Sequence, residues 1–222
     1  MSDTVIPFQT APSDPKLKDL LDIWKKEILL NFNCHHIGTV QSFDTENQTA
    51  TATINYKKTY FQLDRASGLY KSILVDYPIL VDCPVICLGG GKGALMFPIA
   101  QGDECLISFN DRDIDTWFQG ATGAAVATGR LHSFSDGIIT VGVRSLANVL
   151  TDYDPARVVL RNKDAKIALG ETLIKIANDT QDIKTILNDL ISKIEGLTSV
   201  PLSPLDIIQM ELVRARVNAL FE

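Results

Sequence analysis

The sequence predicts a mainly β protein with helices at both ends. Apolar residues alternate with polar ones in several short segments between residues 34 and 118, which is typical of half-buried strands. Three even shorter strand-like segments follow between residues 156 and 178. Residues 16–32 and two segments after residue 179 instead carry apolar residues at helical spacing. We expect five parts: an arm with an amphipathic helix (1–33), a barrel (34–118), a linker with a flanking strand (119–155), a β-stem (156–178) and a helical end (179–222).

Composition narrows the class of protein. Of the 222 residues, 45% are hydrophobic and 22% charged, as in ordinary globular proteins. The net charge is −6 and no Lys/Arg cluster is present, so we expect no nucleic-acid partner. The apolar run 79–88 is interrupted by Asp82 and Pro84, and the polar start of the chain does not resemble a secretory signal. The cysteines are predicted to be buried thiols of a protein made in a reducing cytosol: Cys34, Cys83, Cys87 and Cys105.

The first helix should follow a proline-containing arm, with Asp14 as its cap and Pro15 in its first turn. Its apolar stripe either packs on the chain's own barrel or contacts another subunit, and the sequence leaves both open. The stripe comprises Leu17, Leu20, Leu21, Trp24 and Ile28.

Period-two segments predict the barrel. Short strands at this spacing predict an all-β barrel or sandwich, and the segment is about the size of a five-stranded oligonucleotide/oligosaccharide-binding (OB) barrel. The expected strands are 37–43, 49–56, 59–63, 73–77, 79–88, 95–99 and 104–109, with a further strand at 138–143. Residues 119–134 are rich in Gly and Ala and predict a loop.

The stem segment carries strands at 158–161, 166–169 and 173–176. Strands this short cannot bury a core within one chain, so we expect them to stack or to pair with other copies. The predicted interface residues are Val158, Leu160, Ile167, Leu169, Leu173 and Ile176.

The helical end begins with a short seam. Ile183, Leu187, Leu190 and Ile194 are spaced four, three and four residues apart, as in a coiled coil. Self-association is favoured over packing on the chain's own barrel, because the preceding strands also need partners. Residues 204–221 predict a second amphipathic helix.

Sequence patterns that could carry chemistry are incomplete. The GGGKG run at 89–93 lacks the Ser/Thr and the following helix of a phosphate loop, and predicts a tight turn. The DRDID run at 111–115 lacks the Gly and closing Glu of a calcium loop, which favours a solvated or inter-subunit polar face. His35 and His36 point to opposite faces of a strand, so they could bind a metal only as copies of one His around a threefold axis. We therefore expect no enzyme, and no catalytic, cofactor or metal site.

One stretch of the sequence resembles a known family. The motifs are LVDCPV at 80–85, the Gly-rich loop, FPIAQGDECLISFNDRDIDTW at 97–117 and the SDG turn at 135–137. Through these motifs, residues 33–145 resemble the N-terminal barrel of the phage central-spike family, which includes baseplate assembly protein V and related membrane-piercing spikes.

The resemblance implies an OB barrel in each of three chains and an intertwined trimeric β-helix as the stem. It implies a structural virion protein, made in the host cytoplasm, that docks on the trimeric tail hub and transiently meets the bacterial outer membrane during contraction. The candidate hub contacts are Leu17, Leu21, Trp24 and Ile28. Family spikes often bind iron through a His-X-His motif at the tip. This chain has no histidine after His132, so the metal is not carried over, and its helices could hold a separate tip protein.

Two other classes remain open. A trimeric adhesin could bind carbohydrate or peptidoglycan through loops near 89–93, and exposed aromatic rings at Trp117 and Phe118 would favour it. A cell-wall enzyme would need two carboxylates in a cleft.

Overall fold

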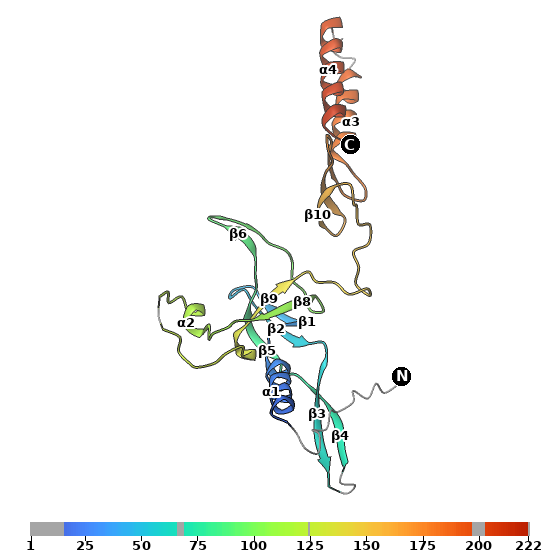
Figure 1. The fold of residues 1–222 in the computed structure, drawn as a ribbon. Helices are drawn as coiled ribbons and strands as arrows, with labels where there is room; N and C mark the ends of the chain where they lie inside the picture. The colour runs from blue at the N-terminus through green and yellow to red at the C-terminus, as the bar shows by residue number, and fades with distance from the viewer. Residues whose placement is uncertain (1–15, 66–68, 124, 197–202, 222) are drawn as a thin grey trace. The chain divides into compact units, whose positions relative to one another are not determined.

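The computed structural model describes residues 16–65, 69–123, 125–196 and 203–221, and the predicted arm 1–15 lies outside them. The chain divides into two compact units, Met1–Val149 and Leu150–Glu222, which are described separately below (Figure 1). No helix among the described residues combines the length and the apolar character needed to cross a membrane.

The first unit is built on a curled five-stranded antiparallel sheet. The strand order is β5-β2-β1-β8-β9, so the first strand lies in the middle. The sheet consists of β1 (His35–Asp44), β2 (Thr49–Ile54), β5 (Leu80–Pro84), β8 (Glu104–Phe109) and β9 (Gly137–Val141). A parallel bridge joins Val85 to Ile139, and the Ile86 N–H donates to the Ile139 carbonyl at 2.9 Å. The two edges of the sheet therefore meet at one point, which makes it a half-closed barrel.

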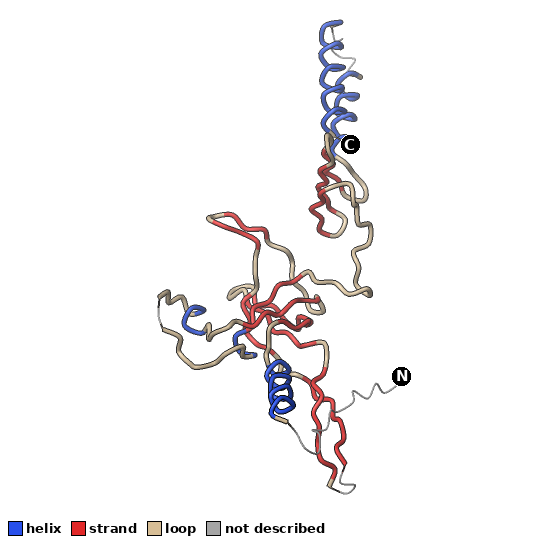
Figure 2. Tube along the Cα trace, in the orientation of Figure 1, coloured by secondary structure: helices blue, strands red, loops and turns tan. Residues whose placement is uncertain are grey.

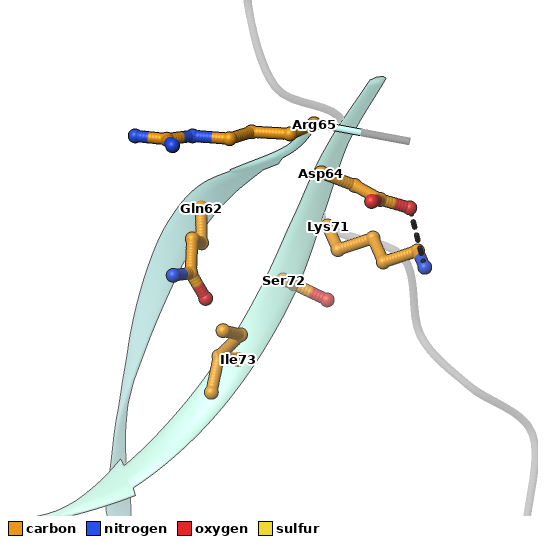
Figure 3. A pocket seen from close by; sticks show the side chains of 6 residues that line it. All are labelled: Gln62, Asp64, Arg65, Lys71, Ser72 and Ile73. Atoms are coloured by element: carbon orange, nitrogen blue, oxygen red, sulfur yellow. Dashed lines mark ion pairs between the residues drawn. The ribbon is translucent and has the colours of Figure 1, made fainter. Parts of the chain in front are cut away.

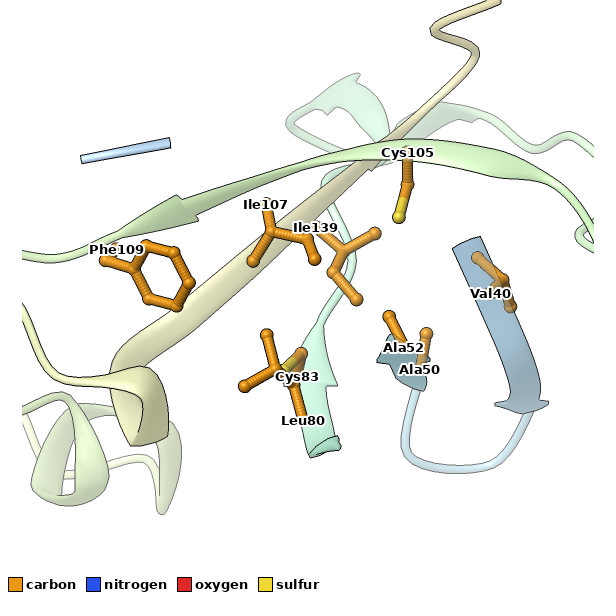
Figure 4. Packing of buried hydrophobic residues seen from close by; sticks show 9 residues of the cluster. All are labelled: Val40, Ala50, Ala52, Leu80, Cys83, Cys105, Ile107, Phe109 and Ile139. Carbon is orange, nitrogen blue, oxygen red and sulfur yellow. The ribbon is translucent and has the colours of Figure 1, made fainter. Parts of the chain in front are cut away.

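The core of this unit lies inside the curl (Figure 4). Strand alternation points Cys105, Ile107 and Phe109 inward from β8, and Ile107 and Ile139 are fully buried. Gly38 on β1 is required for close packing, because a Cβ there would lie 2.5 Å from Ile107 Cδ1 and 2.7 Å from the Thr53 carbonyl oxygen. The remaining core residues are Val40, Ala50, Ala52, Leu80 and Cys83.

Two hairpins and three short helical segments complete the first unit (Figures 1 and 2). The hairpins are β3 (Lys57–Asp64) with β4 (Leu69–Asp76) and β6 (Leu88–Gly90) with β7 (Gly93–Leu95). The helices are α1 (Leu17–Asn31), α2 (Asp115–Phe118) and the 3-10 turn η1 (Phe134–Asp136).

Most predicted elements are confirmed, with three corrections. The run 79–88 is split into β5 and β6, because Val85 and Ile86 leave the β5 ladder to bond Gln48 and Ile139, and pairing resumes only at Leu88. The predicted strand 95–99 is wrong, because pairing ends at Leu95. Cys34 and Cys87 are exposed, so only Cys83 and Cys105 are the buried thiols expected, and burial raises the pKa of each of these two to about 11.

The second unit is a three-stranded antiparallel meander followed by a helical hairpin. Strands β10 (Val158–Asn162), β11 (Ala165–Leu169) and β12 (Ile174–Ala177) pair in chain order. Helices α3 (Ile183–Glu195) and α4 (Pro204–Leu220) then lie side by side (Figure 1). Asp182 caps α3 through the Thr185 N–H at 2.8 Å, and Ser203 and Asp206 form a capping box on α4.

Candidate functional site

The meander of the second unit has one face made almost entirely of aliphatic side chains. The register pairs Val158 with Leu169 and Leu160 with Ile167, and it pairs Ile167 with Ile176 on the other side. Paired residues share a face, so these side chains form one continuous surface. They are all exposed: Val158 by 72%, Leu160 by 48%, Ile167 by 42%, Leu169 by 47% and Ile176 by 39%. We call this surface the aliphatic face.

The opposite face is different in character. Its charged residues are all cationic, so we call it the cationic face: it carries Arg161, Lys166 and Lys175, together with Val159, Ala168 and Ala177, of which Ala168 is buried. The large side chains of the aliphatic face are not covered by the described part of the unit. The aliphatic face is therefore a candidate contact surface.

The structure corrects one step of the prediction for this segment. The strands do find pairing partners within one chain, because β10, β11 and β12 form a regular antiparallel ladder. What the chain does not cover is its apolar side chains. Leu173 precedes β12, and alternation places Ile174 on the aliphatic face instead.

The predicted seam of α3 is only partly covered by α4. Ile183 and Leu187 are half-buried, whereas Leu190 is 53% and Ile194 is 36% exposed. The neighbouring Ile186 is 49% exposed. A coiled-coil seam with its middle open to solvent is a second candidate contact surface in the same unit.

Helix α1 of the first unit carries the candidate hub contacts. Leu17, Leu21, Trp24 and Ile28 lie on one helical face and are all about half exposed or more, with Trp24 at 66%. The alternative of packing on the barrel is not seen in the structure, which buries no residue of α1. After the helix ends, the Phe32 ring packs against His132 with ring centroids 3.8 Å apart.

An ion cluster holds together the two loops that follow β8 and precede β9. The Arg130 guanidinium lies 2.9–3.0 Å from carboxylate oxygens of Asp113, Asp115 and Asp136. The side chains of Asp113 and Asp136 are fully buried. Hydrogen bonds from the Thr128 hydroxyl and the Asp115 N–H hold the pKa of Asp113 below its usual value, and the charge of Arg130 adds to this.

This cluster revises the interpretation of the DRDID run. Asp113 does not lie on a solvated face, since it is buried against Arg130. Three carboxylates this close could hold a divalent cation, but the guanidinium already occupies the space between them. We therefore assign the cluster a structural role. Asp136 and Arg130 were missed in the sequence, where nothing marks them as partners of Asp113.

His36 lies in an aromatic cluster at the end of the barrel. Its ring contacts Tyr56, Tyr77, Phe109 and Phe134, with centroids 5.1–6.2 Å away. The Tyr56 hydroxyl donates to Nδ1, and Nε2 donates to Asn33 Oδ1 at 3.4 Å, which fits a neutral imidazole. Burial lowers the pKa of His36.

This environment predicts a loss of stability in mild acid. Because the folded-state pKa of His36 lies below the unfolded value of about 6.5, the unfolded chain binds the proton more readily. The contribution of neutral His36 is complete above that pH and declines as the pH falls below it. We expect the unfolding temperature to fall between pH 7 and pH 5, and His36→Phe to reduce that slope. His35→Gln, at an exposed neighbouring position, should leave the slope unchanged; equal slopes in wild type and His36→Phe would contradict the assignment.

A hollow lies on the β3–β4 hairpin (Figure 3). It is lined by Gln62, Asp64, Arg65, Lys71, Ser72 and Ile73, and Lys71 pairs with Asp64 at 2.7 Å. The GGGKG run forms the turn between β6 and β7, with Gly91 at φ +61°, and does not open a helix. It therefore lacks the geometry of a phosphate loop, as predicted.

The first unit is thus a curled β domain in which the connection between β8 and β9 is held by the ion pairs of Arg130. Residues 37–142 match the family described as the phage protein Gp138 N-terminal domain. The match covers β1 from Ile37 onward and all of β2 to β9, and it ends before the second unit begins. The similarity to this phage protein domain therefore concerns residues 37–142 of the first unit. No curated protein matches the chain.

Proposed function

We propose that the protein is the central spike of a contractile tail baseplate, a homotrimer that docks on the trimeric tail hub and transmits the force of contraction to the host envelope. The aliphatic face of the meander carries this proposal. Its exposed residues belong to a chain whose first unit matches the phage Gp138 N-terminal domain, so a virion assembly is the natural setting for copies to cover one another.

Two other observations support the same assignment. The half-closed five-stranded sheet has the strand number and partial opening of an OB barrel, the domain expected at the hub end of a spike. Helix α1 offers Leu17, Leu21, Trp24 and Ile28 to a partner, and Trp is prominent among residues that dominate binding energy. We assign α1 to the hub contact and the helical end to trimer contacts and a separate tip protein.

The trimer in this proposal uses three aliphatic faces directed at a common axis. A face of Val, Leu and Ile that is exposed in one chain becomes a core when three copies meet, and the cationic faces remain in water. The proposal differs from an intertwined stem in one respect: each chain contributes a complete small sheet. No catalytic step, cofactor, metal or nucleic acid enters it.

Light scattering of the purified chain at micromolar concentration tests the assembly, and three chains per particle is the expected result. Purified cell wall should not be cleared in a turbidity assay. A chain truncated after Asn178 should lose most of its trimer, because the seam on α3 is removed. A stable monomer of the full chain would overturn the proposal.

A second candidate function has one observation in its favour. Trp117 is 56% and Phe118 is 43% exposed, on a short helix whose loop is held rigid by Arg130. Aromatic rings presented in this way suit an adhesin that stacks against carbohydrate or peptidoglycan. Pull-down with purified peptidoglycan, compared between wild type and Trp117→Ala, decides between the two: binding that the substitution removes favours the adhesin.

A further inference from the structure

The α3–α4 hairpin buries several polar groups beside Ile191 where its helices meet, and it exposes aliphatic side chains to solvent. Arg214 pairs with Glu195 at 2.6 Å, and Asn188 donates to Asn218 at 3.1 Å. Within the described residues, Asn188 Oδ1, Glu195 Oε1 and Arg214 Nε are buried without a partner. Meanwhile Leu190, Ile208 and Leu212 are more than half exposed. A hairpin of this kind is incompletely packed alone, because the hydrophobic effect favours the reverse distribution.

Helical geometry gives the direction of each side chain of α3, since successive residues are about 100° apart. Asn188, Ile191 and Glu195 face α4, as their burial shows. The centre of the seam, at Leu190 and Ile194, lies roughly 100° from that direction. Ile186 and Lys193 lie roughly 180° from it, and both are exposed. The seam is thus covered by α4 on one flank only.

The same geometry applies to α4. Met210, Arg214 and Val217 are half-buried along the side that faces α3. Val213 lies about 80° from that side and is 44% exposed. Ile208 lies on the outer side, about 140° from the direction of α3. Val213 is therefore an aliphatic residue beside the intrachain contact but not in it.

Three copies arranged with their α3 seams toward a common axis bring these two flanks together. Each α3 then has its own α4 on one side, and the neighbouring copy presents its α4 on the other. The hydrogen bonds from Asn188 to Asn218 and from Arg214 to Ser192 put Lys193 at about the height of Val213. Rotation about an axis parallel to the helices leaves heights unchanged, so Lys193 of one copy and Val213 of the next are level.

Resting on the proposed homotrimer, we propose that α4 of each copy lies in the groove between its own α3 and the α3 of the next copy, with Val213 beside Ile186 and Lys193 of that neighbour. The occupant of the exposed α3 flank is a second copy of this chain. The reason is that each uncovered flank carries an exposed aliphatic side chain, Ile186 on α3 and Val213 on α4, and the arrangement that buries the seam brings the two flanks together. The result is a bundle of six helices around the axis.

Disulfide trapping in the full chain tests this contact. The exposed Cys34 and Cys87 are first replaced by Ser, and Lys193→Cys is combined with Val213→Cys. Within one chain Lys193 points away from α4, so a disulfide can form only between copies. After mild oxidation we expect bands of two and three linked chains on a non-reducing gel. The control combines Lys193→Cys with Ile208→Cys, which faces outward, and should remain single chains.

The outcomes are separable. If light scattering gives three chains but the Lys193→Cys/Val213→Cys protein forms no linked bands, the groove contact is overturned while the trimer stands. Equal linking in the Ile208→Cys control would also overturn it, because the bonds would then reflect random collision. If light scattering gives single chains, both the trimer and the groove contact fall. Linked trimers in the test protein alone support both.

Discussion

Replacing Ile167 with Asp is expected to abolish assembly while leaving the single chain folded. Ile167 lies at the centre of the aliphatic face, paired with Leu160 on one side and Ile176 on the other. In the proposed trimer its side chain would enter a dry core, and three carboxylates would meet there without partners. We expect the concentration needed for half-association to rise at least about a hundredfold, measured by light scattering over a dilution series.

The control for this experiment is its neighbour on the same strand. Lys166→Asp introduces the same residue into β11 but on the cationic face, so it carries the same cost in strand propensity without entering the core. It should assemble as wild type does. Since Ile167 is 42% exposed in the single chain, circular dichroism of Ile167→Asp at low concentration should retain the native β signal. Normal assembly of Ile167→Asp would mean that the aliphatic face is not the interface.

Replacing Arg130 with Met should produce the largest loss of stability in the first unit. The substitution keeps an unbranched side chain of similar bulk but removes the charge that lies between three carboxylates, two of them fully buried. Buried charges without a counter-ion are strongly destabilising. We expect the unfolding temperature at pH 7 to fall by roughly 10 °C, measured by calorimetry.

Arg112→Met is the matched control for this substitution. Arg112 is adjacent to Asp113 in the chain, but its side chain is 62% exposed and pairs with the exposed Asp111 at 3.8 Å. Exposed pairs contribute little, so its unfolding temperature should hardly change. The deficit of Arg130→Met should also shrink toward pH 4, because protonation relieves unpaired buried carboxylates. Equal unfolding temperatures for the two variants would show that the cluster does not stabilise the domain.

Much of the fold followed from local patterns. Strict alternation in Glu104–Phe109 predicted β8 to the residue, and the spacing of Ile183, Leu187, Leu190 and Ile194 predicted α3. These elements are predictable because one face of each must be apolar, and the period of that face identifies the element.

The misses share a different physical origin. Alternation in residues 156–178 fits a strand paired within its chain as well as one paired with another copy, so the pattern could not reveal the meander. The link from Arg130 to Asp113 and Asp136 joins residues in irregular loops, where no period constrains which charges meet. The exposure of Cys34 and Cys87 likewise depends on where the strands end, and strand ends are poorly predicted from residue propensities.

The local pairing of the meander also bears on how such a particle is built. Its strands are joined by turns of a few residues, so the ladder can form soon after the segment leaves the ribosome, without waiting for another chain. Chains that pair their strands separately can then collide as finished building blocks. Strand pairing should therefore proceed without another chain, and only the later association of folded chains should depend on protein concentration. In a stem intertwined from three chains, folding of the strands would itself require the chains to meet.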